Sequence, residues 1–521
     1  MSSSLSTSSA TSEKVCIEHL DPVEATVQAR PEVNYQLYRP HVDTSNVDEK
    51  RLMRKIDWWL LPWLTFLYLL SFLDRSSIGN AKLYGLEKDL DINDTQYNVA
   101  LAVFFVAYSL FEVPSNIVLK RLRPSIWLSL LMLLWGIVMT TQGLVHNYGG
   151  LLGTRWMLGL FEGGLFPGVA YYLSCWYKRS EFGLRLAIFF SAGTVSGAFG
   201  GLLAAAISNM GGIGGKPAWS WIFILEGLIT VVASVASFFI IQDFPDTAKF
   251  LTEEERTFVV RRLQGDDRFS AGGEELRMKY ILQSLTDWKT WVGMFLLMGS
   301  DGALYAFSQF LPSIINQVCF KATPANLLTV PVYTVACIVT CGVGYYADRH
   351  GHRGIINIIF SCIGAAGYII LIASRNAALS YVGVYLAACG IYPNIPNTIA
   401  WASNNLEGSI KRSVTLAMMI GFGNLNGAVS SNVYRGQDTP WYTLGHGIIL
   451  MYISITIVCA ILYRWLLKRE NARRDRGERD EVITVGLNED KEDLLKNGCY
   501  SSVEEAKREK GDWWSGYRYA Y

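Results

Sequence analysis

Charged side chains interrupt long apolar stretches of this 521-residue chain. Asp74 and Arg75 follow the apolar stretch 60–73, and the residues after them also fit a helix that continues past the pair. Arg155 and Glu162 are seven residues apart, which places them on one face of a second helix. An ion inside a membrane is costly and usually faces a bundle interior or a cavity. The four residues are therefore candidates for binding and proton transfer. The simpler interpretations are that the first helix ends at the pair 74–75 and that the second pair is a structural ion pair.

A second group of residues has the spacing of a charged loop, G-x-x-x-D-R-x-G-x-R. Its members are Gly344, Asp348, Arg349, Gly351 and Arg353. An acid at such a position can pair with basic groups and with a helix N-terminus. If the pairing depends on conformation, the loop acts as a latch; the simpler interpretation is a basic loop that only sets topology. The related stretch 119–124 lacks both the acid and the glycine, so we expect the latch to be degenerate there.

Other polar residues inside or at the ends of apolar stretches are weaker candidates. Asp301, Glu112 and Glu226 are acids inside predicted spans, and each could instead be a buried hydrogen-bond partner. Asp301 is taken as a third proton-coupling acid, ahead of the two glutamates. Asn404 and Asn424 could line a polar cavity or satisfy broken helix backbone. We expect both asparagines to bind the substrate.

The composition predicts an integral membrane protein. Hydrophobic residues make up 51% of the chain and charged residues 17%, against about 25% charged in soluble domains. The net charge of +1 gives no reason to expect a nucleic acid partner. Apolar runs of the length needed to cross a bilayer recur in two groups of six. They are 57–82, 95–120, 125–145, 149–176, 185–209 and 218–241, then 288–316, 324–346, 354–374, 378–401, 412–434 and 443–467.

The distribution of Lys and Arg predicts the topology. Basic residues gather in alternate loops, which places both termini in the cytosol. We expect disordered tails at both ends and a central loop that contains an amphipathic helix, opened by a capping box at 252–255. Asn93, in the sequence Asn-Asp-Thr, is then a glycosylation site outside the cell. The predicted parts are a cytosolic tail 1–55, a helical bundle 56–241, the central loop 242–287, a second bundle 288–468 and a cytosolic tail 469–521.

Several segments identify a family. The loop signature, FLDRSSIGNAKLYGL, RWMLGLFEGGLFPGVAYYLSCWYKRSE, FLPSIINQ and ANLLTVPVY resemble the fungal anion:cation symporters of the major facilitator superfamily. That family includes the allantoate and nicotinate permeases. The resemblance covers about 50–470 and is greatest to the nicotinate permeases, notably through MGSDGALYAFSQFLP and the 401–440 stretch. It implies a twelve-helix, all-α membrane fold of two six-helix bundles.

The resemblance also implies roles for the candidate residues. In related organic-anion carriers, an Asp-Arg pair and an Arg and a Glu form the substrate and proton machinery. By that likeness Arg75 and Arg155 attract the substrate carboxylate or hold the acids, and Asp74 and Glu162 carry protons. A guanidinium suits this role because it stays charged and grips a carboxylate with two donors.

These features predict proton-coupled uptake of a small organic anion such as nicotinate, by a monomer in the plasma membrane, without a cofactor or metal. The main alternative is export of a fungal secondary metabolite, which the fold alone cannot exclude. A nutrient sensor that does not transport is a more remote alternative. An enzyme is disfavoured because the six histidines are scattered and no nucleophile or nucleotide-binding motif is present.

Overall fold

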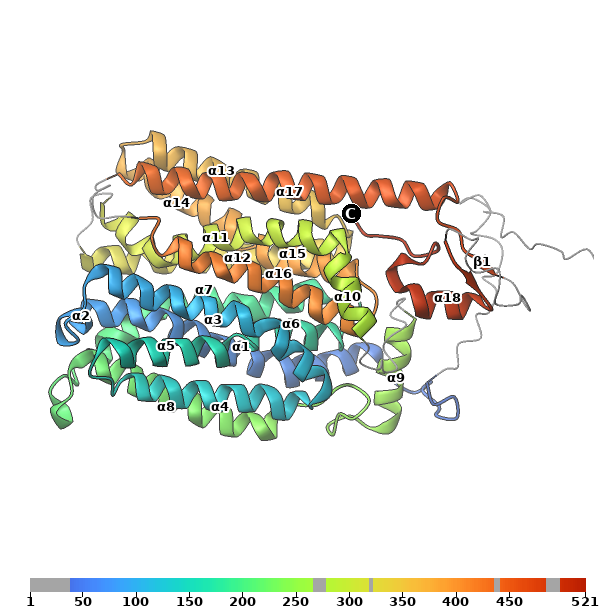
Figure 1. Ribbon diagram of the computed structural model, residues 1–521, viewed down its shortest axis with the longest axis horizontal. Helices are drawn as coiled ribbons and strands as arrows, with labels where there is room; N and C mark the ends of the chain where they lie inside the picture. Colours follow the sequence, from blue (N-terminus) through green and yellow to red (C-terminus); the bar gives the residue numbers. More distant parts are fainter. Residues whose placement is uncertain (1–37, 266–277, 318–321, 435–440, 484–496) are drawn as a thin grey trace, which may run out of the picture. The chain divides into compact units, whose positions relative to one another are not determined.

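The computed structural model describes residues 38–265, 278–317, 322–434, 441–483 and 497–521. Most of this part of the chain is helical, and Figure 1 shows long helices lying side by side. The main helices are α1 Glu49–Leu83, α3 Asp94–Arg121, α4 Pro124–Gln142, α5 Tyr148–Glu162, α6 Leu165–Ser174, α7 Phe182–Ser208, α8 Ala218–Ile240, α11 Trp288–Gln317, α12 Ala322–His350, α13 Arg353–Ala373, α14 Ala377–Ile391, α15 Asn394–Asn404, α16 Ser409–Ser430 and α17 Thr443–Asp475. Shorter ones are α2 Leu86–Asp89, η1 Ile213–Gly215, α9 Glu253–Gln264, α10 Met278–Thr286, α18 Val503–Lys510 and η5 Gly511–Trp513.

The helices account for the twelve predicted spans when two broken pairs are each counted once. Eight spans in the described residues, α14 with α15 among them, are long and apolar enough to cross a membrane, and the bent helix α7 makes nine. The other three spans are α5 with α6, α11 and α16. These three carry the candidate residues Arg155, Glu162, Asp301 and Asn424. Polar residues inside a membrane are retained mainly for function.

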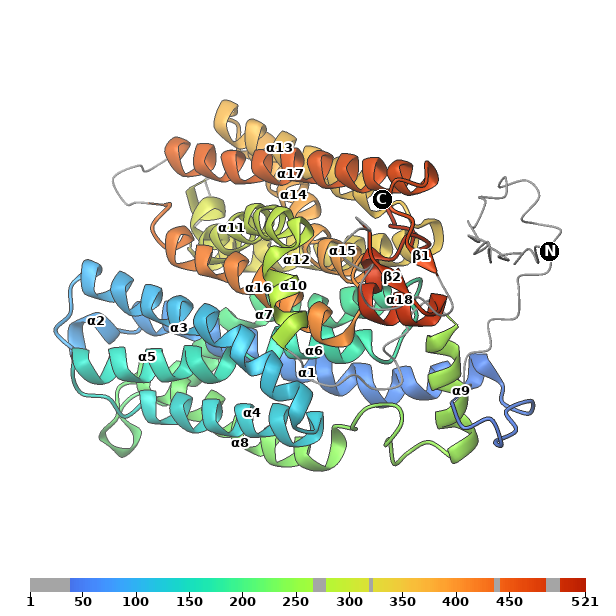
Figure 2. The same ribbon diagram turned by 45° about the vertical axis from the view of Figure 1, so that its right-hand side comes forward.

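The spans pack as two groups that meet along two helix pairs. Within the first group, α4 packs on α8, α1 on α7 and α3 on α5; within the second, α11 packs on α16 and α13 on α14. The groups meet where α3 lies against α16 and α7 against α12. Figure 2 shows the blue-to-green helices of the first group beside the yellow-to-orange helices of the second.

Local signals explain where several helices begin and end. Asp48 caps α1, and its carboxylate accepts from the backbone N–H of Lys50 and Arg51. The helix then runs without a break past Asp74 and Arg75 to Leu83, so the prediction that it continues beyond the pair is confirmed. The predicted capping box at Thr252 is also confirmed, because it opens α9 with both reciprocal hydrogen bonds formed.

Close backbone contacts set the path of α5 and α6. The two helices are separated by Gly163 and Gly164. A Cβ at Gly163 would lie 2.6 Å from the carbonyl oxygen of Tyr108, so only glycine lets α5 approach α3 this closely. This approach brings Glu162, the last residue of α5, into the centre of the helical bundle.

The segment 468–519 forms a separate unit with its own contacts. It holds a parallel pair of two-residue strands, β1 Val482–Ile483 and β2 Cys499–Tyr500, followed by α18. Arg474 is buried within this unit, where its guanidinium donates to the carbonyl of Asp512 at 2.9 Å and lies over the ring of Tyr519. The prediction of a disordered tail is therefore wrong for its described part, because a buried arginine and tyrosines that are far apart in sequence supply a small core. The predicted N-terminal tail up to residue 37 lies outside the described residues.

Candidate functional site

A small cavity lies in the middle of the helical bundle, between the two groups of spans. We call it the central cavity. Its lining residues come from seven helices: Tyr68, Phe72 and Arg75 from α1, Tyr108 from α3, Phe166 from α6, Phe190 from α7, Asp301, Leu304 and Tyr305 from α11, Ile395 from α15 and Asn424 from α16. The walls are mainly aromatic, and the polar groups are few. Such a combination is typical of small-molecule sites.

Arg75 is the cation of this cavity. Its Nη2 and Nε lie 2.7 and 3.2 Å from Oε1 of Glu162, and the two side chains are 10% and 0% exposed. Its Nη1 donates to the hydroxyl of Tyr305 at 2.8 Å. The guanidinium also lies over the rings of Phe72 and Tyr108, at 5.1 and 4.8 Å from their centroids. It therefore joins an acid of the first group of spans to a hydroxyl of the second.

Only one of the two carboxylate oxygens of Glu162 accepts hydrogen bonds from the described residues. Its Oε1 accepts from Ser71, one helical turn before Arg75, at 2.7 Å, as well as from the guanidinium. Its Oε2 is buried and has no hydrogen-bond partner among the described residues. A buried carboxylate oxygen without a donor is costly and is often explained by a ligand or proton that binds there.

The polar contacts continue from Arg75 across the second group to a further acid. The hydroxyl of Tyr305 donates to Oδ1 of Asn424, and Nδ2 of Asn424 donates to Oε1 of Glu112 at 2.7 Å. Five side chains from both groups thus form one hydrogen-bonded chain, which we call the central chain. The sequence predicts site roles for three of its members, gives Glu112 as a weaker candidate and does not single out Tyr305. Tyr305 is four residues after Asp301, on the same face of α11, and that spacing was the signal available in the sequence.

Asp74 faces away from its neighbour Arg75. Its Oδ2 accepts from Trp135 on α4 at 2.6 Å and from Thr230 on α8 at 3.1 Å. Glu226 lies on the same side of α1, where Ser77 donates to it. The structure therefore places Asp74 inside the first group and outside the lining of the central cavity.

Arg155 also lies inside the first group. It is 1% exposed and lies over the ring of Phe223. With the amide of Gln142 turned so that its oxygen faces the guanidinium, this oxygen accepts from Nη2 at 2.8 Å. Although Arg155 and Glu162 share a face of α5, two helical turns separate them along the axis. Arg155 does not line the central cavity.

Asn404 and Asn424 are not brought together. Asn424 lines the central cavity, whereas Asn404, at the end of α15, donates to the backbone carbonyl of Arg179 at 3.1 Å. Its neighbour Asn405 makes two hydrogen bonds with the backbone of Ala520, donating at 2.9 Å and accepting at 2.8 Å. Asn404 therefore lies where the two groups of spans meet at one end of the bundle, outside the central cavity.

The predicted latch residues join the two groups at that same end. Asp348, at the end of α12, accepts from the backbone N–H of Gly183 and Leu184 at 3.1 and 2.7 Å. These donors lie in the first turn of α7, where the helix dipole favours a negative charge. Asp348 also pairs with Arg353, which in turn donates to Asn397 on α15 at 3.1 Å.

The two glycines of this loop are required for different structural reasons. Gly351 has φ +73°, a conformation that side chains disfavour. A Cβ at Gly344 would lie 2.8 Å from the Cβ of Ala187, so glycine permits the close packing of α12 on α7. Arg349 is exposed and contacts the hydroxyl of Tyr345 within its own helix.

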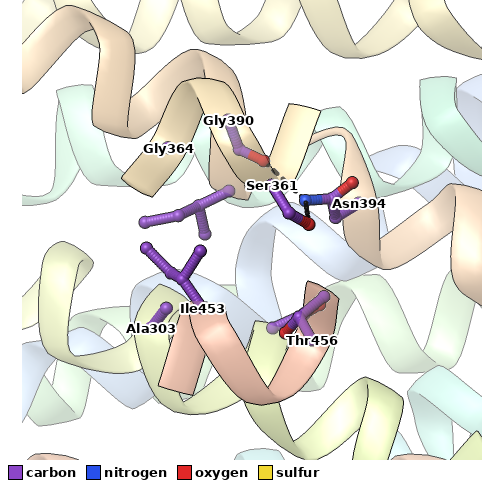
Figure 3. A pocket seen from close by; sticks show the side chains of 9 residues that line it. Ala303, Ser361, Gly364, Gly390, Asn394, Ile453 and Thr456 are labelled. Atoms are coloured by element: carbon purple, nitrogen blue, oxygen red, sulfur yellow. Dashed lines mark hydrogen bonds between the residues drawn. The ribbon is translucent and has the colours of Figure 1, made fainter. Parts of the chain in front are cut away.

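A second small cavity lies wholly within the second group of spans (Figure 3). Asn394 points into it and donates to Ser361 at 2.9 Å and to the carbonyl of Gly390 at 2.7 Å. The rest of the lining is mostly small or apolar. This cavity carries no charged residue in its lining, so the central cavity is the better candidate for an ionic ligand.

Asn93, the predicted glycosylation site, is exposed at the start of α3. Its side-chain oxygen caps the helix by accepting from the N–H of Gln96 at 2.8 Å. Glycosylation at the amide nitrogen would leave this oxygen free to cap the helix. The geometry is thus compatible with the predicted modification.

Comparison with known proteins identifies the family. The Major Facilitator Superfamily profile matches residues 64–431. An uncharacterized transporter of Schizosaccharomyces pombe is 34% identical over 87% of this chain and 90% of its own. The MFS-type transporter cnsO of Penicillium expansum is 35% identical over 82% and 86%. The high-affinity nicotinic acid transporter of Saccharomyces cerevisiae is 33% identical over 82% of this chain and 79% of its own.

Solved structures agree on the fold. The proton:xylose symporter XylE superposes with a TM-score of 0.61 at 13% identity, over 79% of this chain and 96% of its own. The fucose:proton symporter FucP of E. coli superposes with a TM-score of 0.55 at 12% identity, over 78% and 99%. The profile match, the fungal relatives and the twelve-span fold together show that this chain belongs to the major facilitator superfamily, and it is a multi-pass membrane transporter and not an enzyme.

Proposed function

We propose that this transporter imports a small organic monoanion, nicotinate or a related carboxylate, together with protons, across the plasma membrane of a fungal cell. The observation that carries the proposal is Arg75, a cation held between Glu162 of the first group of spans and Tyr305 of the second. A substrate carboxylate that enters the central cavity meets this guanidinium and its planar set of donors. The aromatic walls suit a flat ring beside that carboxylate.

Competition for Arg75 would couple the anion to a proton. In the structure Glu162 occupies two donors of the guanidinium. When a substrate carboxylate takes those donors, Glu162 is left buried with Ser71 alone. An unpaired buried carboxylate is costly, so proton uptake by Glu162 accompanies anion binding. Asp74 and Arg155 do not contact the substrate in this scheme, and instead hold α1 and α5 in place within the first group of spans. Asp301 is a further polar residue in the lining of the central cavity.

Alternating access would depend on contacts at one end of the bundle and in its middle. With both termini in the cytosol, the Asp348 contact with α7 closes the cytosolic end, and Arg349, Gly351 and Arg353 belong to the same loop. Opening toward the cytosol must break this contact while the central chain comes apart. The two groups of spans would thus rock about the central cavity.

The names of similar proteins support this proposal. One relative is a nicotinic acid transporter, and two proteins of the same fold are proton symporters. The relatives whose names give no substrate leave export of a fungal metabolite as the second candidate. The direction of transport must therefore be measured as well as the substrate.

The test is uptake of labelled nicotinate by cells that lack their own permease, at pH 5 and pH 7, with and without a protonophore. We expect faster uptake at pH 5, collapse with the protonophore and loss in Glu162→Gln. The matched control is Glu253→Gln, which removes an exposed acid paired with Arg39 and should transport normally. Net loss of label from preloaded cells, driven by external acid, would instead establish export.

A further inference from the structure

Glu112 on α3 is a fully buried acid at the junction of the two groups of spans. Its Oε1 accepts a hydrogen bond from Asn424 of α16 at 2.7 Å, and the residue is 0% exposed. Its Oε2 is buried and has no hydrogen-bond partner among the residues that the structure describes. The acid therefore belongs to one group of spans and its donor to the other.

The partner helix is shaped to receive this carboxyl group. Gly421 of α16 leaves the space that Glu112 Oε2 occupies, because a Cβ at this glycine would clash with that oxygen. Gly423, two residues later, leaves the corresponding space for Asp301 of α11. The segment Gly421–Asn424 thus accepts one acid from each group and supplies the donor to Glu112. A contact this close exists only while α3 and α16 are packed together.

No cation pairs with Glu112 in the described part of the chain. Arg75 is the cation of the central cavity, and its donors are engaged by Glu162 and Tyr305. The titratable groups that act on Glu112 are Arg75 on α1, Tyr108 on its own helix, and Asp301 and Tyr305 on α11. A buried carboxylate with one neutral donor and no cation is too costly to stay ionised.

We propose that Glu112 is a second proton carrier, which holds a proton while α3 and α16 are packed together and releases it when Asn424 withdraws with the second group of spans. This inference rests on the proposed function, since it adds a proton to the one that accompanies Glu162. Two protons moving with one monoanion carry a net positive charge, so transport by the wild type produces a current. Withdrawal of α16 exposes Glu112 on the side where the bundle opens, and the proton leaves there.

The transport test uses wild type and Glu112→Gln in vesicles with a fixed pH gradient and labelled nicotinate. For a gradient of about two pH units, removing one of two protons lowers the limiting accumulation about 100-fold, tenfold per pH unit. We expect Glu112→Gln to keep uptake, to accumulate about 100-fold less and to lose the substrate-evoked current. A wild type that transports without current, or a Glu112→Gln variant with unchanged current for each molecule transported, overturns the inference.

Glu226→Gln is the matched control. Glu226 is also buried, has one hydrogen-bonded and one unpartnered oxygen among the described residues, and lies inside the first group of spans. Its neutral variant should keep both the accumulation and the current. Loss of the current in both variants alike would show a general effect of removing buried acids and would overturn the specific role of Glu112.

A second measurement does not need the substrate, and so separates this inference from the proposed function. Infrared spectra of the purified protein at neutral pH should contain the C=O stretch of a protonated carboxyl that is absent from Glu112→Gln. The band should shift in Asn424→Ala, which keeps the acid and removes its donor. Identical spectra of all three proteins overturn the inference. Failure of nicotinate uptake by the wild type, with the infrared result as expected, overturns only the proposed substrate.

Discussion

Asp348→Asn is the perturbation that bears most directly on how the two groups of spans are held together. Asp348 accepts two backbone N–H groups at the start of α7 and pairs with Arg353, whose side chain is 3% exposed. Asparagine keeps one oxygen for the α7 donors but loses the charge, and it leaves the buried guanidinium with Asn397 as its remaining side-chain acceptor.

The free-energy cost of Asp348→Asn to the closed arrangement follows from these contacts. Breaking a buried ion pair by removing one partner costs about 3–5 kcal/mol, and we take about 3 because asparagine still accepts one hydrogen bond. Since about 1.4 kcal/mol is tenfold, the closed arrangement loses about 150-fold in equilibrium against one that is open at this end. A closed population of about 99% would fall to about 40%.

The assay is a distance distribution between spin labels at Ser180, beside α7, and Tyr345 on α12, both exposed, in a protein whose native cysteines are replaced. We expect the population at a longer distance to rise to about 60% in Asp348→Asn. The control Asp57→Asn removes an acid that pairs with Arg185 of α7 at 2.9 Å, but from within the first group of spans. It should leave the distribution unchanged. A distribution in Asp348→Asn equal to that of the wild type would refute the latch.

Three further predictions test the site and the packing around it. Tyr305→Phe removes the hydroxyl between Arg75 and Asn424 and leaves both groups without this partner, at a cost of about 1–3 kcal/mol. Uptake at low substrate concentration should therefore fall about 5- to 150-fold, and unchanged initial rates would contradict this role. Gly367→Ala places a Cβ 2.5 Å from the backbone nitrogen of Ala387, so thermal unfolding should show a loss of about 1–3 kcal/mol, whereas Gly342→Ala, with no atom within 4 Å of its Cβ, should be neutral. Thr95→Ala removes the sequon but keeps the Asn93 cap, so the mass lost on endoglycosidase treatment of the wild type should already be missing from the variant.

Much of the fold could be predicted from the sequence, because a span needs a long apolar run and its ends carry readable signals. The apolar runs predicted the helices, and the capping box at Thr252 predicted α9. The breaks between α5 and α6 and between α14 and α15 were not predicted, since a break of a few residues does not interrupt an apolar run. The order in the segment around Arg474 was also missed, because its core is assembled from residues more than 30 positions apart.

The site could be predicted only in part. Arg75 and Glu162 do meet, as two ions inside a membrane should, but Asp74 points elsewhere because successive residues of a helix diverge by about 100°. The spacing of Tyr305 from Asp301 places the two residues on one face of α11. The contacts that Tyr305 and Glu112 make in the central chain join spans far apart in the sequence, and spacing within one span does not show them. Asn404 and Asn424 look alike in the sequence, yet one lies at the end of a span and the other in its middle.

The purified wild type in vesicles that contain no other protein shows whether a proton gradient drives carboxylate import through this transporter. Labelled nicotinate is added outside, and the external pH is lowered below the internal pH. We expect nicotinate to accumulate inside the vesicles above the external concentration, to leave them when a protonophore is added, and not to accumulate in Glu162→Gln vesicles. Equilibration to the external concentration alone, at the same rate with and without the pH gradient, would contradict proton coupling.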